Sequence, residues 1–238
     1  QRLSKVVRQR IPYIYTPLYE GGETTPGLFA IGETPQEQLG PAMAMLQQEF
    51  RPRKWALIGN DYVWPRSSHS FAKTCLKQMN VDLAMECYVP FGLPSMTGLV
   101  DRLEASGADA VLVSLVGQDA VNFNRVFGRR GLHKSILRLS CALEENGLMA
   151  CGEGNLERLF SVSSYFGSIS TDANACLVDF IDGLEGAAAH DQIAQFQLHH
   201  RGRKVHVFRT HCCGIGKCVC GSGPVVGWNH NGTVAPIY

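Results

Sequence analysis

The stretch KWALIGNDYVWPRSS, residues 54–68, decides the fold class of this sequence. Its apolar part, residues 55–59, shows no alternation, which is typical of a strand covered on both faces of a parallel sheet. The polar turn that follows then lies at the carboxyl end of the strand, where open parallel sheets bind ligands. We therefore expect Asp61, Tyr62 and Trp64 at a ligand cleft.

The next helix is expected to begin after this turn. Ser67 or Ser68 can cap it, and Pro65 disfavours helical geometry at Trp64. A second interpretation stays open: Tyr62 and Trp64 simply cover the top of the sheet, because large aromatic residues are commonly buried.

Outward from this stretch, strand-like and helix-like segments alternate. A Thr34 cap with Glu37 three residues later is typical of a capping box at a helix start. The predicted strands begin near residues 11, 28, 54, 83, 110, 136 and 159, and the predicted helices cover residues 34–50, 67–79, 95–107, 119–131, 143–150 and 171–184. Such alternation predicts an α/β fold with a doubly wound parallel sheet, helices on both faces and right-handed crossovers.

The composition excludes several classes of protein. The 238 residues carry 22 basic and 21 acidic side chains, so the formal charge of +1 argues against a nucleic-acid partner. We find no apolar run long enough for a direct membrane span and no signal peptide. Because Gln1 is not an initiator methionine, we expect the chain to begin part-way through a longer protein.

Catalytic motifs are missing as well. The sequence has no GxGxxG after a strand, no GxxxxGK[ST] and no GxSxG. Glu144 and Glu145 are adjacent, and adjacent side chains on a helix diverge by about 100°. We therefore predict no enzyme activity, no catalytic residues and no cofactor.

The predicted strands instead end in side chains suited to a small polar ligand, although any single tip is compatible with an ordinary turn. Apolar walls with a few directed polar groups are typical of small-molecule pockets. These tips comprise Tyr15, Thr16, Tyr19, Asp61, Tyr62, Trp64, Gly117, Gln118, Asp119, Ser140, Cys141, Glu144, Tyr165 and Phe166.

Five segments also carry a family resemblance. In order they are YIYTPLYEGGE, ALIGNDYVWPRSS, YVPFG, DRLEASGADAVLVSLVGQDAVNFNR and SSYFGSISTDANA. They resemble the type I periplasmic-binding-protein family, in the branch of short-chain-amide, urea and branched-chain amino-acid receptors. The resemblance spans residues 2–183. It implies a two-lobed protein that closes around a ligand by a hinge motion.

The resemblance also implies positions for the ligand-binding residues. It places Tyr15, Thr16 and Pro17 on the first-lobe side of the cleft, and Tyr62 and Trp64 at the aromatic lid. Gly117 and Gln118 match a second cleft loop. Glu144 lies near an acidic ligand contact.

The sequence departs from the family at both ends. The segment that supplies most of the first lobe is absent before Arg2, and after Gly183 the chain has a His/Cys-rich stretch. We expect residues 1–33 to be a remnant of the first lobe and hinge crossover, with that lobe largely missing, and residues 34–185 to form the ligand-binding lobe. Residues 186–238 are interpreted as an irregular tail that ends in a hairpin, because Asn231-Gly232 between apolar flanks is a hairpin-turn signal.

The nine cysteines fall into two groups. Five are interpreted as small buried hydrophobic residues: Cys75, Cys87, Cys141, Cys151 and Cys176. The others lie in HCCGIGKCVC, residues 211–220, where His211, Cys212, Cys218 and Cys220 are zinc-compatible ligand types. Their spacing lacks paired CxxC knuckles, so we predict no metal site in residues 199–220 and favour a disulfide-prone tail or non-native sequence.

Two functions follow from the resemblance. The first is a periplasmic or extracytoplasmic solute-binding receptor for a small amide, urea or amino acid, whose partner is the permease of an ABC transporter. The second is a cytoplasmic amide-sensing negative regulator that acts on a protein partner. A signal peptide upstream of Gln1 favours the first function, and free core cysteines favour the second.

Overall fold

The computed structural model describes residues 12–163, 166, 175, 176 and 179, together with the backbone of three further strands at 206–209, 225–228 and 234–237. The His/Cys-rich segment lies outside the described residues, apart from the first of these strands. The predicted helix over residues 171–184 also lies largely outside them.

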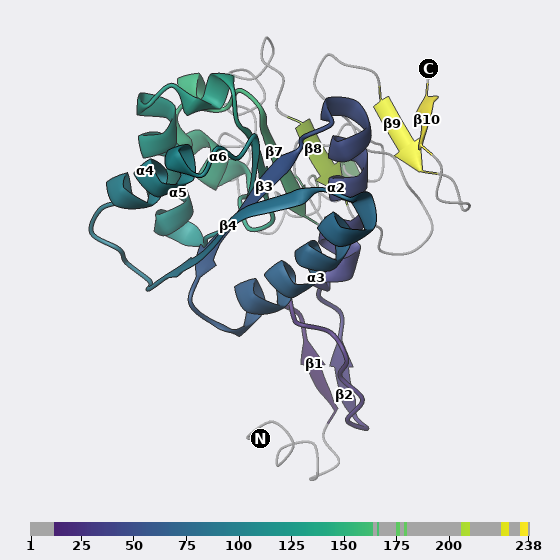
Figure 1. The fold of residues 1–238 in the computed structure, drawn as a ribbon. Helices are drawn as coiled ribbons and strands as arrows, with labels where there is room; N and C mark the ends of the chain where they lie inside the picture. The colour runs from purple at the N-terminus through teal and green to yellow at the C-terminus, as the bar shows by residue number, and fades with distance from the viewer. Residues whose placement is uncertain are drawn as a thin grey trace.

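A six-stranded parallel sheet forms the centre of the fold (Figure 1). Its strand order is β4-β3-β5-β6-β7-β8, and every neighbouring pair is parallel. The strands are β3 (Lys54–Asn60), β4 (Asp82–Val89), β5 (Ala110–Ser114), β6 (Leu137–Ser140), β7 (Leu159–Ser163) and β8 (His206–Arg209). The predicted doubly wound parallel sheet is confirmed.

Strand β8 lies where we expected irregular chain. Its backbone pairs in parallel with β7, from Phe160↔His206 to Ser163↔Arg209. The sequence KVHVFRT, residues 204–210, does contain β-branched and aromatic residues, which favour strands. The segment is too short for this pattern alone to predict a strand. Only the pairing with β7 identifies it as a strand.

Helices cover both faces of the sheet, as predicted. The helices are α2 (Pro35–Phe50), α3 (Val63–Met79), α4 (Thr97–Ala105), α5 (Gly117–Arg129) and α6 (Glu145–Cys151), with 3-10 turns η1 (Leu132–Lys134) and η2 (Glu153–Asn155). Helices α2 and α3 pack with Leu57 and Leu112 on one face. Helices α4, α5 and α6 pack with Ile58 and Val113 on the other. Successive strand residues alternate between two cores, which explains the continuous apolar runs.

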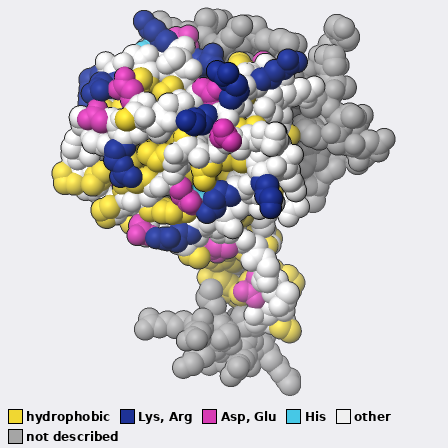
Figure 2. Space-filling model, in the orientation of Figure 1, with side chains coloured by type: hydrophobic (Ala, Val, Ile, Leu, Met, Phe, Trp, Pro, Cys, Tyr) yellow, Lys and Arg dark blue, Asp and Glu magenta, His cyan; other side chains and the backbone are white. Residues whose placement is uncertain are grey.

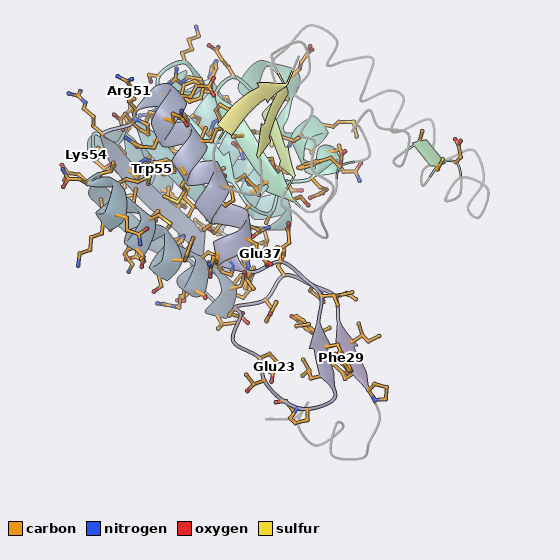
Figure 3. The ribbon with its side chains drawn as sticks, turned by 90° about the vertical axis from the view of Figure 1, so that its right-hand side faces the viewer. Glu23, Phe29, Glu37, Arg51, Lys54 and Trp55 are labelled. Carbon is orange, nitrogen blue, oxygen red and sulfur yellow. The ribbon has the colours of Figure 1, made fainter. Side chains whose placement is uncertain are left out.

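Helix α2 begins at the predicted capping box. The side chain of Thr34 accepts from the Glu37 amide, and the Glu37 carboxylate accepts from the Thr34 amide. Figure 3 shows Glu37 at the start of this helix, and Trp55, which is fully buried in the same core, beside it.

Helix α3 begins earlier than predicted. Its first residue is Val63 and its N-cap is Tyr62, so Ser67 and Ser68 lie inside the helix and do not cap it. Pro65 is tolerated there because amide groups of a first helical turn have no intrahelical acceptor to lose. The expectation that Pro65 keeps Trp64 out of the helix is therefore wrong.

Two small sheets accompany the lobe. Strands β1 (Tyr13–Tyr15) and β2 (Leu28–Ala30) form a parallel pair, from which Phe29 points outward (Figure 3). Strands β9 (Val225–Trp228) and β10 (Val234–Ile237) pair antiparallel, as a hairpin requires. Their connecting residues lie outside the described part.

The five cysteines of the described part carry free thiols. Cys87, Cys141 and Cys151 are buried, as predicted. Cys75 is half-buried and Cys176 is exposed, so the expectation of burial is wrong for Cys176.

Candidate functional site

The strand order creates one topological switch point. Strand β3 lies between β4 and β5, and the helices that follow β3 and β5 pack on opposite faces of the sheet. The carboxyl ends of these two strands therefore border the position where open α/β sheets bind ligands. The turn after β3 carries Tyr62, and helix α5, which follows β5, begins with Gly117 and Gln118.

Tyr62 lies at this edge in an aromatic cluster. Its ring is half-buried and lies 5.1 Å from the ring of Phe91 and 6.3 Å from that of Trp64. Burial raises the pKa of the Tyr62 hydroxyl, and Cys141, Glu20 and Tyr15 raise it further. Tyr15, 47 residues earlier in the sequence, thus lies near enough to Tyr62 to affect the pKa of its hydroxyl.

Trp64 lies in the core instead. It is 4% exposed and packs in the cluster that includes Leu39 and Leu112. Helix α3 begins at Val63, and successive side chains on a helix point about 100° apart. The Val63 side chain therefore faces outward, with 62% exposure, while that of Trp64 faces the core. Our expectation that the Trp64 ring faces the cleft is therefore wrong, and Trp64 supports Tyr62 from the interior.

The other predicted ligand residues lie along the same edge or beside it. Gly117 and Gln118 are exposed in the first turn of α5, where Gln118 donates to Asn122 over 2.8 Å. Glu144 is exposed at the N-cap of α6, one strand further along.

The first-lobe candidates follow β1. Tyr15 is half-buried and makes an edge contact with Tyr19 at 6.5 Å, whereas Thr16 and Pro17 are exposed. The chain passes very close to Gly32 here, since a Cβ at that position would lie 1.8 Å from the Pro17 carbonyl oxygen. Gly32 therefore fixes the backbone that carries Thr16 and Pro17.

Two parts of the edge were missed or undervalued by sequence reasoning. Phe91, in the loop after β4, is 57% exposed and its ring contacts that of Tyr62. No periodic pattern in the sequence indicates this position. Asn60 and Asp119 are buried and joined by a hydrogen bond of 2.8 Å. The available signal was a polar residue at the end of the apolar strand β3 and another in the first turn of the helix after β5.

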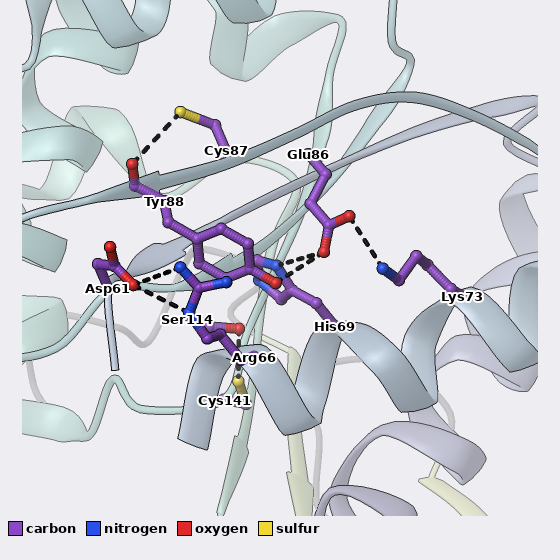
Figure 4. A network of polar contacts seen from close by, with 9 residues as sticks. All are labelled: Asp61, Arg66, His69, Lys73, Glu86, Cys87, Tyr88, Ser114 and Cys141. Carbon is purple, nitrogen blue, oxygen red and sulfur yellow. Dashed lines mark hydrogen bonds and ion pairs between the residues drawn. The ribbon is translucent and has the colours of Figure 1, made fainter. Parts of the chain in front are cut away.

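A second polar network lies where α3 packs on β4 (Figure 4). The Glu86 carboxylate accepts from Lys73 over 2.9 Å and from the Tyr88 hydroxyl over 2.7 Å. Nδ1 of His69 lies 3.6 Å from the same carboxylate, and its ring stacks on Tyr88. Arg66 pairs with Asp61 at 2.6 Å, and its guanidinium lies over the ring of Tyr88, 4.3 Å from the ring centroid.

His69 also explains a glycine in the opening stretch. A Cβ at Gly59 would lie 2.7 Å from Pro65 and 3.3 Å from Nε2 of His69. Helix α3 can approach the carboxyl end of β3 this closely only because Gly59 has no side chain. The helix that carries Trp64 is positioned by this contact.

Burial lowers the pKa of His69 to about 4, against the opposing effect of Glu86. Because the folded protein disfavours protonated His69, we expect the free energy of unfolding to fall as the pH is lowered from about 6.5 to about 4, by on the order of 3 kcal/mol. Urea unfolding across this pH range measures the slope. His69→Gln should remove most of this slope, because only the smaller contribution of carboxylates such as Glu86 remains, and the control His133→Gln should keep it. An unchanged slope in His69→Gln contradicts the assignment.

Within the described residues, no group of three or more His, Cys, Asp or Glu side chains is arranged to hold a metal ion. Residues 211–220 lie outside that part, so their lack of a metal site stays a prediction. None of the helices in the described part has both the length and the apolar character needed to cross a membrane.

The solved structures to which this chain is similar include solute-binding proteins of ABC transporters. A solute binding protein of an ABC transporter from Rhodopseudomonas palustris HaA2, in complex with p-hydroxybenzoic acid, matches with a TM-score of 0.66 and 16% identity, over 84% of this chain and 62% of its own. A branched chain amino acid ABC transporter protein from Thermus thermophilus, with bound valine, matches with a TM-score of 0.67 and 18% identity, over 83% and 54%. A substrate binding protein of an ABC transporter from Aeropyrum pernix matches with a TM-score of 0.69 and 18% identity, over 83% of this chain and 54% of its own.

These likenesses establish the fold, and they show that the chain spans only 54% to 62% of the length of these three proteins. A family model described as "Periplasmic binding protein" matches residues 1–197. That match covers most of the chain and includes the whole parallel sheet up to β7. The chain therefore belongs to the periplasmic binding protein family.

Proposed function

We propose that this chain is the ligand-binding lobe of an extracytoplasmic solute receptor that delivers a small amide, urea or amino acid to an ABC transporter. The observation that carries the proposal is the position of Tyr62 and Phe91, which pair at 5.1 Å beside the topological switch point. Family membership supports a receptor role without catalysis. The side chains at this edge support the proposed ligand class.

The edge offers aromatic surface and neutral polar groups. Tyr62 and Phe91 supply flat apolar contact, and Gln118 supplies an amide that can both donate and accept. Glu144 supplies a carboxylate suited to an amine or amide N–H. Such a set fits a small, planar, neutral group or an amino group better than a free anion.

The ABC transporter permease is the proposed partner, because the structural neighbours come from ABC transporters. The free thiols of Cys87, Cys141 and Cys151 favour the second candidate, a cytoplasmic amide-sensing regulator, since oxidising compartments tend to pair cysteines. The complete reading frame separates the two candidates: a signal or lipoprotein peptide upstream of Gln1 supports the receptor.

Thermal unfolding with and without ligand tests the proposal. A ligand that binds only the folded protein stabilises it by about 2.7 kcal/mol at a hundredfold excess over Kd. We expect a concentration-dependent rise in Tm with acetamide, urea or valine, both for this chain and for the product of the complete reading frame. 4-Hydroxybenzoate serves as the anionic comparison. If none of the three neutral or zwitterionic compounds raises the Tm of either protein, the ligand class is wrong.

A further inference from the structure

We propose that Asn60 and Asp119 are positioning residues, which hold the aromatic pair of Tyr62 and Phe91 in the arrangement that a ligand meets. The inference rests on the proposed function, because it concerns the same edge of the sheet. It adds two buried residues that contact no ligand themselves.

Asn60 and Asp119 meet between the two strands of the switch point. Asn60 is the last residue of β3 and is fully buried, and Asp119 lies in the first turn of α5 with 5% exposure. Nδ2 of Asn60 donates to Oδ2 of Asp119 over 2.8 Å. The start of α5 also favours a carboxylate, because the amide groups of a first helical turn carry partial positive charge.

Each of the two residues also holds a neighbouring loop. Oδ1 of Asn60 accepts from the Val116 amide over 2.9 Å, which fixes the turn between β5 and α5. Oδ2 of Asp119 accepts from the Gly92 amide over 3.0 Å, which fixes the loop after β4. The tips of β3, β4 and β5 are therefore joined through two side chains.

This connection sets the positions of both aromatic rings. The Tyr62 amide donates to the Asn60 carbonyl over 3.0 Å, and Phe91 directly precedes Gly92. Gly92 has a φ of +69°, a left-handed conformation that other residues adopt only with strain. The anchored glycine holds the Phe91 ring outward, at 57% exposure, where only Tyr62 contacts it among the aromatic rings of the described part.

The buried carboxylate of Asp119 restrains the loop that carries Phe91. Burying a charge is unfavourable unless strong hydrogen bonds compensate, and bonds to a charged acceptor are the stronger ones. Asp119 receives its two donors from two different segments, the end of β3 and the loop after β4. Its charge therefore restrains the loop after β4 rather than the interior of one element, and the loss of that charge should loosen Phe91 first.

Limited proteolysis tests this without any ligand. Chymotrypsin cleaves after exposed phenylalanine, so its rate at the Phe91–Gly92 bond reports the freedom of that loop, with fragments identified by mass spectrometry. Asn60→Asp places two carboxylates at the 2.8 Å contact and should accelerate this cleavage by about tenfold or more, the factor that corresponds to one lost hydrogen bond to a charged group. The double variant Asn60→Asp/Asp119→Asn restores a donor–acceptor pair between the two side chains. The amide group that donates to position 60 cannot also accept from the Gly92 amide, so the cleavage rate should return only part of the way to the parent rate.

Two controls separate positioning from general destabilisation. Asn122→Ala removes the exposed hydrogen bond with Gln118 on the same helix and should leave cleavage at Phe91 unchanged. Cleavage after Phe50, at the end of α2, should not change in any variant. Equal acceleration at Phe50 and Phe91 overturns the inference, and so does an unchanged rate at Phe91 in Asn60→Asp. If Asn60→Asp does not fold, Asp119→Asn, which keeps an acceptor oxygen but loses the charge, is judged by the same criteria.

Ligand binding completes the test. For a compound that raises the Tm of the parent, the loosened variant should lose most of that rise at the same concentration, and the double variant should regain part of it. If a variant with faster cleavage at Phe91 keeps the full ligand-induced rise in Tm, the positioning role of Asn60 and Asp119 is overturned. Absence of any rise in the parent, with cleavage at Phe91 still altered, overturns the proposed function instead.

Discussion

Replacing Trp64 with alanine is expected to lower the free energy of unfolding by about 3–5 kcal/mol, with or without ligand. The indole is 4% exposed and packs between α2, α3 and the sheet, so truncation leaves a cavity in the core. Urea unfolding of Trp64→Ala and the parent measures the loss.

Tyr62→Ala is the matched comparison, since the two rings lie 6.3 Å apart on the same turn. The Tyr62 ring is only half-buried, so we expect a smaller loss, about 1–2 kcal/mol, together with loss of most of any ligand-induced rise in Tm. Should Trp64→Ala keep the stability of the parent, the core position of this residue is contradicted.

Replacing Arg138 with alanine is expected to lower the free energy of unfolding by a similar amount, about 3–5 kcal/mol. Arg138 in β6 is fully buried and donates to Asn124 over 2.7 Å and to the carbonyl oxygens of Asn155 and Glu157 over 2.6 and 2.7 Å. Its guanidinium also lies 4.5 Å from the ring of Phe127. Truncation leaves three acceptors without this donor, one of them buried and two partly buried, although relief from burying a charge offsets part of the loss.

Arg125→Ala provides the control for this prediction. Arg125 is exposed, and its Nε donates to one carbonyl oxygen, that of Ala150, over 2.8 Å. We expect its loss to cost less than about 1 kcal/mol. Arg138→Lys should be only partly as stable as the parent, because the single ammonium group of lysine cannot reproduce the planar set of N–H donors of a guanidinium. Equal stability of Arg138→Ala and Arg125→Ala would show that the buried network contributes little.

Much of the fold was predictable from local patterns. The apolar runs of β3 and β5 and the alternation of strands and helices predicted a parallel sheet with helices on both faces. The capping box at Thr34 marked the start of α2 correctly. These signals succeed because burial on two faces and the satisfaction of helix-end amide groups depend on neighbours along the chain.

The candidate site was only partly predictable. Because the carboxyl ends of parallel strands share one edge, the sequence located Tyr62, Gly117, Gln118 and Glu144 along it. Phe91 was missed, since its loop carries no periodic pattern and its contact with Tyr62 arises from the pairing of β3 with β4. The roles of these residues toward a ligand stay predictions.

The sequence by itself determined the order and type of the central elements, because hydrophobic periodicity and capping are properties of short segments. Only the tertiary structure decided the rotation of α3, which turns Trp64 inward, since that rotation depends on the close packing of Pro65 and His69 against Gly59. It also decided the pairing of β8 and the partners of Arg138 and Asp119. A buried polar group is stable only where distant segments supply its hydrogen bonds, and no local pattern specifies which segments those are.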